Sequence, residues 1–218
     1  MTSQQPALRL TEIFFSLQGE ARTAGLPTVF VRLTGCPLRC GYCDTAYAFH
    51  GGNLISLEEI VEEVAQYPTR HVTVTGGEPL AQPNCLPLLT QLCDLDYLVS
   101  LETSGALPVA DVDPRVSKVM DIKTPDSGEE DRNLWQNLDH LTDNDQLKFV
   151  ICSRGDYEWA RAVVNDRGLN NTAGEVLFSP VWETLPPANL ADWILEDGLP
   201  VRMQVQLHKI LWGEQQGK

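Results

Sequence analysis

Three cysteines, Cys36, Cys40 and Cys43, lie within eight residues of one another on a stretch that directly follows a β-rich run. Thiolates are the usual protein ligands of iron–sulfur clusters. A cubane cluster has four irons, so three cysteines can hold three of them and leave the fourth free to bind a small molecule. The segment therefore favours a loop that carries a [4Fe-4S] cluster with one open iron.

Other roles for the three thiols fit the sequence less well. A structural zinc site normally has four closed ligands, and the chain has no second cysteine pair with zinc spacing, although His50 could act as a fourth ligand. A redox disulfide between Cys40 and Cys43 lacks a thioredoxin-like context. Core cysteines are not expected on a loop rich in Gly and Pro. The other cysteines are scattered, and we interpret them as small buried apolar residues: Cys85, Cys93 and Cys152.

Short β-rich runs alternate with helical patterns along the chain. We predict strands over residues 8–15, 28–33, 71–75, 97–102, part of 116–123, 146–151, 175–178 and 201–207, and a loop over 34–53. Ser56 and Glu59 have capping-box spacing, so a helix is expected to begin at Ser56. Further helices are predicted over 87–93, 134–141, 156–164 and 188–196.

This alternation indicates parallel strands with helices outside. The chain has 218 residues, which is short for a closed eightfold barrel of roughly 250 residues. The predicted fold class is therefore α/β, an incomplete TIM-like barrel, in a single domain over residues 1–218. In such folds ligands bind at the carboxyl ends of the strands. The polar residues predicted to converge there are Thr75, Glu102, Thr103, Asp121, Lys123, Ser179 and His208.

The formal net charge of −14 disfavours direct binding to nucleic acid, because an acidic surface repels phosphate backbones. No apolar run approaches the length of a membrane span. The first ten residues are polar and lack the pattern of a secretory signal. These features predict a cytoplasmic protein that binds neither nucleic acid nor membrane.

The C-x3-C-x2-C spacing resembles the signature of the radical S-adenosylmethionine (SAM) superfamily, and its place after the first strand of the alternating run agrees. A second segment, Thr75 to Pro79, resembles the superfamily's GGE segment, which receives the amino group of SAM. Its two glycines would let a ligand approach the backbone closely. A lone Gly-Gly-Glu-Pro would indicate only a turn. The resemblance implies that one electron from the reduced cluster cleaves SAM, and that the resulting radical removes a hydrogen atom from the substrate.

Further segments resemble the 7-carboxy-7-deazaguanine synthase family. They are Glu12–Glu20, Pro27–Cys36, Cys43–Thr45, Glu102–Gly105, Asp121–Pro125 with Ser127–Glu129, and Gln204–Lys209. They span most of the chain in family order. The resemblance implies a lyase that converts 6-carboxy-5,6,7,8-tetrahydropterin to 7-carboxy-7-deazaguanine with loss of ammonia, on the route to queuosine and related 7-deazapurines. It also implies Mg²⁺, a homodimer, and an electron donor such as a flavodoxin or ferredoxin.

The resemblance also implies which residues form the site. Cofactor-binding residues are Cys36, Cys40, Cys43, Gly76, Gly77, Glu78, Thr103, Asp121 and Lys123. Residues for the pterin are Leu17, Gln18, Gly19, Glu20, Arg32, Thr75, Glu102 and His208, and Thr45 is expected to bind Mg²⁺. Carboxylates suit the nitrogens of a pterin, Arg32 and His208 suit its carboxylate, and Mg²⁺ prefers oxygen ligands. Taken singly, each side chain could be a surface or hydrogen-bonded core residue, and strand-end placement favours function for Glu102 and His208.

The chain departs from some family members at its end. In those members the chain stops a few residues past the histidine and its terminal carboxylate can reach the substrate, whereas here the sequence continues from Trp212 to Lys218. That contact is not transferred to this chain. Two alternatives stay open at this point: a radical SAM activating enzyme for a glycyl-radical protein, and a zinc-binding module without enzymatic activity.

Overall fold

One sheet forms the centre of the molecule. The computed structural model describes residues 5–218. In these residues the sheet has nine strands in the order β3-β1-β2-β4-β5-β6-β7-β8-β9. The strands are β1 (Ala7–Leu17), β2 (Pro27–Leu33), β3 (Asn53–Ser56), β4 (His71–Gly76), β5 (Leu98–Thr103), β6 (Ser117–Ile122), β7 (Gln146–Ile151), β8 (Glu175–Pro180) and β9 (Arg202–Met203). β1 pairs antiparallel with β2 and with β3. From β2 onward in the sheet order, through β4 to β9, each strand is parallel to its neighbour. Residues 1–4 lie outside the described residues. They belong to the predicted domain and to the terminus that is predicted to lack a secretory signal.

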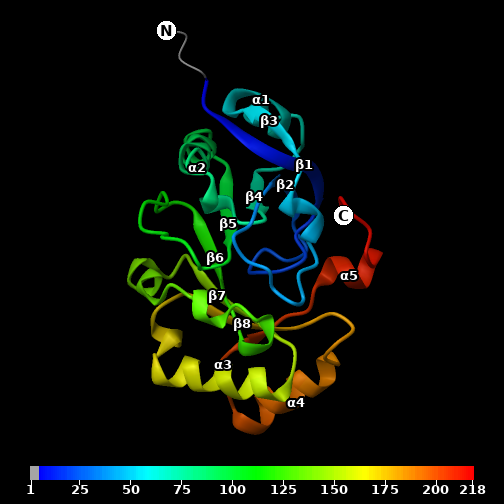
Figure 1. The fold of residues 1–218 in the computed structure, drawn as a ribbon, viewed down its shortest axis with the longest axis vertical. Coiled ribbons are helices and arrows are strands. Elements are labelled where there is room, and N and C mark those ends of the chain that lie inside the picture. Colours follow the sequence, from blue (N-terminus) through cyan, green and yellow to red (C-terminus); the bar gives the residue numbers. More distant parts are fainter. Residues whose placement is uncertain (1–4) are drawn as a thin grey trace.

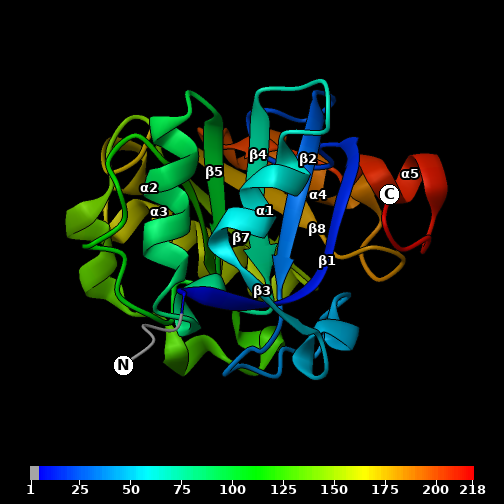
Figure 2. The ribbon, with the colours of Figure 1, turned by 90° about the horizontal axis from the view of Figure 1, so that it is seen from above.

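Helices cover the outer side of this curved sheet. The α-helices are α1 (Leu57–Val64), α2 (Cys85–Asp94), α3 (Arg154–Asp166), α4 (Pro187–Asp197) and α5 (Leu207–Trp212). Short 3₁₀ helices are η1 (Ala46–Phe49), η2 (Pro79–Ala81), η3 (Pro125–Ser127), η4 (Glu130–Arg132), η5 (Trp135–His140) and η6 (Leu169–Asn171). Helices α1 to α4 follow one another around the outside, while α5 and the carboxyl terminus lie apart from them, on the side of β1 (Figures 1 and 2).

The sheet curves without closing. Strands β3 and β9 stand at its two ends, and the strand pairings within residues 5–218 do not join them. The predicted α/β fold, an incomplete TIM-like barrel, is therefore confirmed.

Strand alternation separates the core from the interior of the barrel. In β4, Val72 and Val74 are buried in the apolar core, which also contains Leu88 and Leu92 of α2. The intervening Thr73 donates or accepts hydrogen bonds on the inner side. Because successive side chains of a strand point to opposite faces, the apolar residues meet the helices and the polar residues face the interior.

The predicted start of α1 is confirmed in atomic detail. The Ser56 hydroxyl accepts a hydrogen bond from the Glu59 backbone N–H at 3.2 Å, and the Glu59 carboxylate accepts one from the Ser56 N–H at 2.9 Å. This reciprocal pair satisfies two N–H groups that the first helical turn leaves without partners.

The predicted strand over residues 201–207 is largely wrong. Strand β9 covers Arg202–Met203, and Leu207 begins helix α5. Polar and apolar residues alternate over 201–207 although most of this segment is not a strand. The polar side chains of Gln204 and Gln206 both donate hydrogen bonds to Glu20. His208 therefore lies in the first turn of a helix and not at the end of a strand, which corrects the prediction.

Three other expectations need correction. Strand β3 begins at the end of the predicted loop and pairs with β1, although its short sequence carries little strand signal. The segment predicted as a helix over 134–141 is the 3₁₀ helix η5. In the described chain, the connections from β5 to β6 and from β6 to β7 contain loops and 3₁₀ turns instead of α-helices, so the alternation is incomplete. Within residues 5–218, none of the helices combines the length and apolar character that a membrane span requires.

Candidate active site

A cavity of about 750 Å³ opens at the carboxyl ends of the parallel strands. The loop after β2 and the segment that contains η3 lie on this same edge of the barrel (Figure 2). Every residue that the resemblance assigned to cofactor, substrate or Mg²⁺ lines the cavity, with the exception of Glu78. Residues from β1, β2, β4, β5, β6 and α5, which are far apart in sequence, therefore share one space.

The cysteine loop connects β2 to η1 and is held by hydrogen bonds to a distant turn. The Gly41 N–H donates to the Ser127 carbonyl at 2.9 Å, and the Arg39 N–H donates to the Glu129 carboxylate. Cys36, Cys40 and Cys43 are half-buried, and burial raises the pKa of each thiol. A bound metal deprotonates such thiols, so three sulfurs on one fixed loop fit an iron–sulfur cluster.

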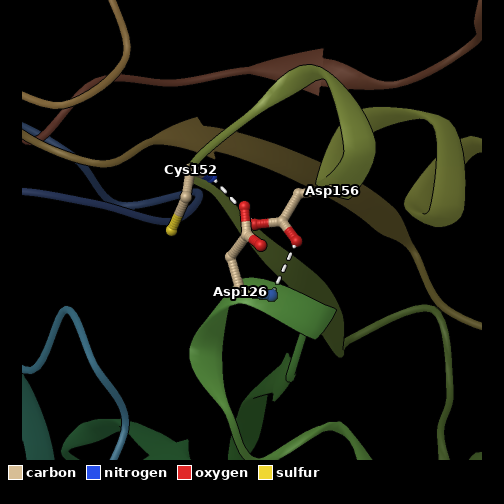
Figure 3. A group of neighbouring side chains, drawn as sticks. All are labelled: Asp126, Cys152 and Asp156. Atoms are coloured by element: carbon tan, nitrogen blue, oxygen red, sulfur yellow. Dashed lines mark hydrogen bonds between the residues drawn. The ribbon is translucent and has the colours of Figure 1, made fainter.

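A second group of possible metal ligands is explained by hydrogen bonding alone. Asp126, Cys152 and Asp156 place ligand atoms within 4.8 Å of one another (Figure 3). The buried Asp156 carboxylate accepts hydrogen bonds from the N–H groups of Cys152 at 3.0 Å and Asp126 at 2.9 Å, and from the Thr124 hydroxyl at 3.0 Å. Asp156 thus joins the end of β7 to the turn that contacts the cysteine loop.

The expectation that Cys152 is a buried core residue is wrong. Cys152 is half-buried at the end of β7 and lines the cavity. Burial and the neighbouring Asp156 charge raise the pKa of its thiol to about 12. Cys85 and Cys93, by contrast, are buried in the apolar core as predicted.

The GGE segment packs directly against the cysteine loop. The Glu78 N–H donates to the Gly35 carbonyl at 2.8 Å, and a Cβ on Gly77 would lie 1.9 Å from that oxygen. What approaches this glycine closely is therefore the backbone of the cysteine loop. Gly76 and Gly77 line the cavity, and because glycine has no side chain, the polar groups that they present there belong to the backbone.

Glu78 lies behind the cavity wall and does not line the cavity. Its carboxylate is fully buried and accepts hydrogen bonds from the hydroxyls of Thr103 and Ser104 and from the backbone N–H of Ser104 at 2.6 Å. It also accepts from the Leu80 N–H at 3.0 Å. Glu78 therefore fixes β4 to β5, and a direct contact between its carboxylate and SAM has no support in this arrangement.

Two carboxylates, those of Glu20 and Glu102, line the cavity. Glu20, after β1, accepts hydrogen bonds from Lys148 at 2.9 Å and Gln206 at 2.9 Å. Glu102, on β5, accepts longer ones from Gln18 at 3.3 Å and Thr75 at 3.2 Å. Burial and the Glu20 charge raise the pKa of Glu102, although Lys148 opposes them. The two acids therefore differ in how readily they ionise.

A buried ion pair lies toward the cysteine loop. Lys123 Nζ is 3.0 Å from Asp121 Oδ2, while Asp121 Oδ1 is buried without a partner among the described residues. Burial lowers the pKa of Lys123, but the charges of Asp121 and Cys40 outweigh that effect and raise it. The unpartnered oxygen is an acceptor available to a hydroxyl or N–H of a bound molecule.

Arg32 is oriented by its neighbours in β1 and η1. Its Nε donates to Glu12 at 2.8 Å, and Glu12 also accepts from the Tyr47 hydroxyl at 2.7 Å. The guanidinium lies over the Phe14 ring at 5.6 Å and the Tyr47 ring at 5.8 Å. Arg32 can therefore present its remaining N–H groups to an anion in the cavity.

Oxygen donors gather beside the last cluster cysteine. The Thr45 hydroxyl donates to Asp44 at 2.8 Å, and Asp44 also accepts from Gln206 at 3.3 Å. Lys209 Nζ is 3.8 Å from Asp44 and pairs with Glu214 at 2.8 Å. A hydroxyl and a carboxylate at adjacent positions fit the oxygen preference of Mg²⁺.

His208 lies directly against the loop after β1. A Cβ on Gly19 would be 2.0 Å from His208 Nδ1, so the glycine leaves space for the imidazole. The tail residues 213–218 also line the cavity.

Several cavity residues were missed by the sequence prediction. They are Lys148, Ser104, Tyr42, Trp182, Gln206 and Lys209. Lys148 carried a usable signal, since it is a charged residue between Leu147 and Phe149 inside a predicted strand. Gln206 and Lys209 lie in the segment Gln204–Lys209 that resembles the family, but their place in the cavity depends on how this last segment folds.

Comparisons with known proteins agree with this geometry. Residues 30–121 match the model of the radical SAM superfamily. The chain is 44% identical to 7-carboxy-7-deazaguanine synthase of Chlorobaculum tepidum, over 97% of both chains. It is 44% identical to the enzyme of the same name from Koribacter versatilis, over 94% of this chain and 97% of that one. Its fold is similar to the crystal structure of QueE from Escherichia coli, with a TM-score of 0.72 at 23% identity, over 93% of this chain and 95% of the other. Since such relatives match the chain along nearly its full length, it belongs to the 7-carboxy-7-deazaguanine synthase family of the radical SAM superfamily.

Proposed function

We propose that this protein is a radical SAM lyase that converts 6-carboxy-5,6,7,8-tetrahydropterin to 7-carboxy-7-deazaguanine with loss of ammonia. The observation that carries the proposal is that the three cluster cysteines and the residues assigned to the pterin line one cavity. In this family a radical formed at the cluster must reach the substrate, so both ligands have to share a space. Family membership supports the same reaction.

The cofactor side of the cavity would be formed by the cysteine loop and the ends of β4, β5 and β6. Cys36, Cys40 and Cys43 would hold the cluster, and the backbone of Gly76 and Gly77 would receive the amino group of SAM. Thr103, Asp121 and Lys123 are the polar groups left for the rest of SAM. When bound, the cluster and SAM supply the hydrogen-abstracting radical, and the protein binds, orients and shields the reactants.

The substrate side would be formed by β1, β2, β5 and α5. A charged Glu20 can accept hydrogen bonds from the N–H groups of a pterin, and Gln18 can both donate and accept. Arg32 and His208 can balance the pterin carboxylate in a protein with a net charge of −14. Thr45, with help from Asp44, would provide oxygen ligands for Mg²⁺ beside that carboxylate.

Three further parts of the proposal concern the whole protein. Residues 1–218 would act as one domain, two copies would form a homodimer, and a flavodoxin or ferredoxin would reduce the cluster. Sedimentation analysis of the anaerobic protein tests the dimer directly.

The reaction itself is tested by anaerobic incubation of the reconstituted protein with SAM, Mg²⁺, a strong reductant and the carboxypterin. We expect 7-carboxy-7-deazaguanine and released ammonia, identified by mass and by an ammonia assay. SAM cleavage without any conversion of the pterin would contradict the proposed substrate while leaving the superfamily assignment intact.

Replacing Glu102 or His208 by alanine should weaken pterin binding roughly tenfold to hundredfold. Each change leaves a polar group of the bound ligand without its partner, which costs about 1–3 kcal/mol, and more if the group is charged. SAM cleavage in the absence of substrate should persist, because the cysteine loop and the GGE segment are unchanged. Calorimetric titration with the carboxypterin measures the effect.

His140→Ala is the matched control for His208→Ala, since His140 is exposed on η5. It should bind the pterin as the wild type does. Wild-type affinity in both Glu102→Ala and His208→Ala would place the pterin elsewhere.

Thr45→Ala should reduce activation by Mg²⁺ while iron content and SAM binding stay unchanged. The change removes the hydroxyl that stands beside Cys43 and donates to Asp44 at 2.8 Å. Thr45→Ser keeps the hydroxyl and should retain the response. A titration of product formation with Mg²⁺ compares the three proteins, and overlapping curves for wild type and Thr45→Ala would remove Thr45 from the metal site.

A further inference from the structure

Lys148 is a largely buried cation in the wall of the cavity, and it lies outside every segment that resembles the family. It occupies the middle of β7, opposite Asp121 of β6, and its side chain is 12% exposed. A buried ammonium is costly unless it is paired. The groups that pair with Lys148 therefore indicate its role.

The strongest partner of Lys148 is Glu20. Lys148 Nζ lies 2.9 Å from Glu20 Oε2 and 3.9 Å from Asp121 Oδ2. The same Glu20 oxygen also accepts a bond from Gln204 at 3.3 Å, and the other oxygen accepts one from Gln206 at 2.9 Å. Three donors therefore fix the orientation of this carboxylate, and part of its acceptor capacity remains for a ligand.

Lys148 pairs directly with Glu20 but not with Glu102, and the pKa values of the two carboxyl groups shift in opposite directions. Burial would raise the pKa of Glu20, but the charge and hydrogen bond of Lys148, the Gln206 bond and the His208 charge lower it to about 2. Glu102 has no direct cation partner at ion-pair distance in the described residues, and its pKa is raised. Lys148 and His208 are the cations that face Glu20, and Lys148 and Arg32 are those that face Glu102. Asp121 faces Lys148 itself.

We propose that Lys148 is a positioning residue that holds Glu20 as a charged, oriented acceptor, and thereby sets which edge of a flat ligand this wall of the cavity accepts. The inference rests on the proposed function and adds a specificity determinant to it. A carboxylate without a proton can only accept hydrogen bonds, whereas a protonated one also presents an O–H. Glu20 held in the charged form therefore selects a ring edge made of N–H donors and rejects an edge made of acceptors.

The test compares Lys148→Met with the wild type in binding 7-carboxy-7-deazaguanine, the expected product, to the cluster-loaded protein. Without the cation, burial dominates at Glu20 and its pKa rises, so Glu20 gains a proton as the pH falls through that higher pKa. We expect affinity about tenfold weaker at about pH 8, and a further tenfold loss relative to wild type at about pH 5.5. Using the ratio of the two dissociation constants cancels the ligand's own titration.

Lys118→Met is the matched control. Lys118 is also a buried lysine of the sheet, paired with Asp145 at 3.0 Å, but it does not line the cavity. It should lower the melting temperature while affinity stays at the wild-type value at every pH. Lys148→Arg keeps a cation near Glu20 and should keep the ratio independent of pH.

A double variant keeps the proposal testable if Lys148→Met fails to fold. Glu20→Gln cannot ionise, so adding Lys148→Met to it should change affinity less than about twofold if Lys148 acts through Glu20. A full additional loss in the double variant would overturn the proposal, and so would a pH-independent ratio or wild-type affinity in Lys148→Met. If instead the wild type neither binds this product nor converts the carboxypterin, the proposed function itself fails.

Discussion

Replacing Cys40 by alanine is expected to abolish both iron loading and SAM cleavage. Cys36, Cys40 and Cys43 lie on one loop of the cavity, and no second cysteine pair in the sequence could replace a lost ligand. With two thiols left on the loop, a cubane cluster would lose one of its three protein ligands. Iron content after anaerobic reconstitution and the rate of 5′-deoxyadenosine formation measure the loss, which should exceed the effect of substitutions at the SAM, Mg²⁺ or pterin positions.

The matched controls are Cys85→Ala and Cys93→Ala. Both thiols are buried in the core around α2, so their loss should lower the free energy of unfolding by leaving a small cavity, with iron content unchanged. Cys152→Ala should also retain its iron, because the Asp156 bond at this position is made by the backbone N–H. Full iron loading and SAM cleavage in Cys40→Ala would refute the cluster assignment.

The Gly77→Ala substitution is expected to lower SAM cleavage by about a hundredfold, because misplacing a reactive group by an ångström can cost that much. A Cβ at this position would lie 1.9 Å from the Gly35 carbonyl oxygen. The cysteine loop or the end of β4 must therefore move, and the 2.8 Å bond from the Glu78 N–H to Gly35 would be strained. Glu78 is anchored to Thr103 and Ser104, so we expect the displacement to strain the cysteine loop and its hydrogen bond from Gly41 to Ser127.

Gly155→Ala provides a control for this substitution. Gly155 lies in the first turn of α3, and a Cβ there would make an ordinary contact of 3.5 Å with the Ser153 hydroxyl. Alanine favours a helix over glycine by up to about 1 kcal/mol, so this variant should melt at the wild-type temperature or above it and cleave SAM normally. A wild-type rate of 5′-deoxyadenosine formation in Gly77→Ala would show that the close packing of the two loops is not required.

The Gly76-Gly77 pair shows which part of the site the sequence predicts and which part it does not. The sequence predicts that Gly76 and Gly77 let a ligand approach the backbone closely, and this stays a prediction. The structure adds a second close approach that the sequence does not contain, because the group that packs against Gly77 is the Gly35 carbonyl of another loop. The partner of a glycine is set by packing between segments, which no local pattern contains.

Local signals determined much of the fold. The capping box at Ser56 and Glu59 located the start of α1, because its hydrogen bonds join residues three apart. The strand predicted over residues 71–75 matches β4 closely, because its β-rich run is a local feature of the sequence. The cysteine spacing located the candidate cluster loop, since its chemistry is contained in eight consecutive residues.

Tertiary structure alone decided the details of the cavity. His208 was expected at the end of a strand, yet it reaches the cavity from helix α5 because the chain after β9 folds across Gly19. Lys148 gained its role from Glu20, a residue 128 positions away in the sequence. Hydrogen bonds within one turn of chain are specified by neighbouring residues, whereas pairs of this kind exist only after distant segments have packed, and their charge states follow from the burial that packing creates.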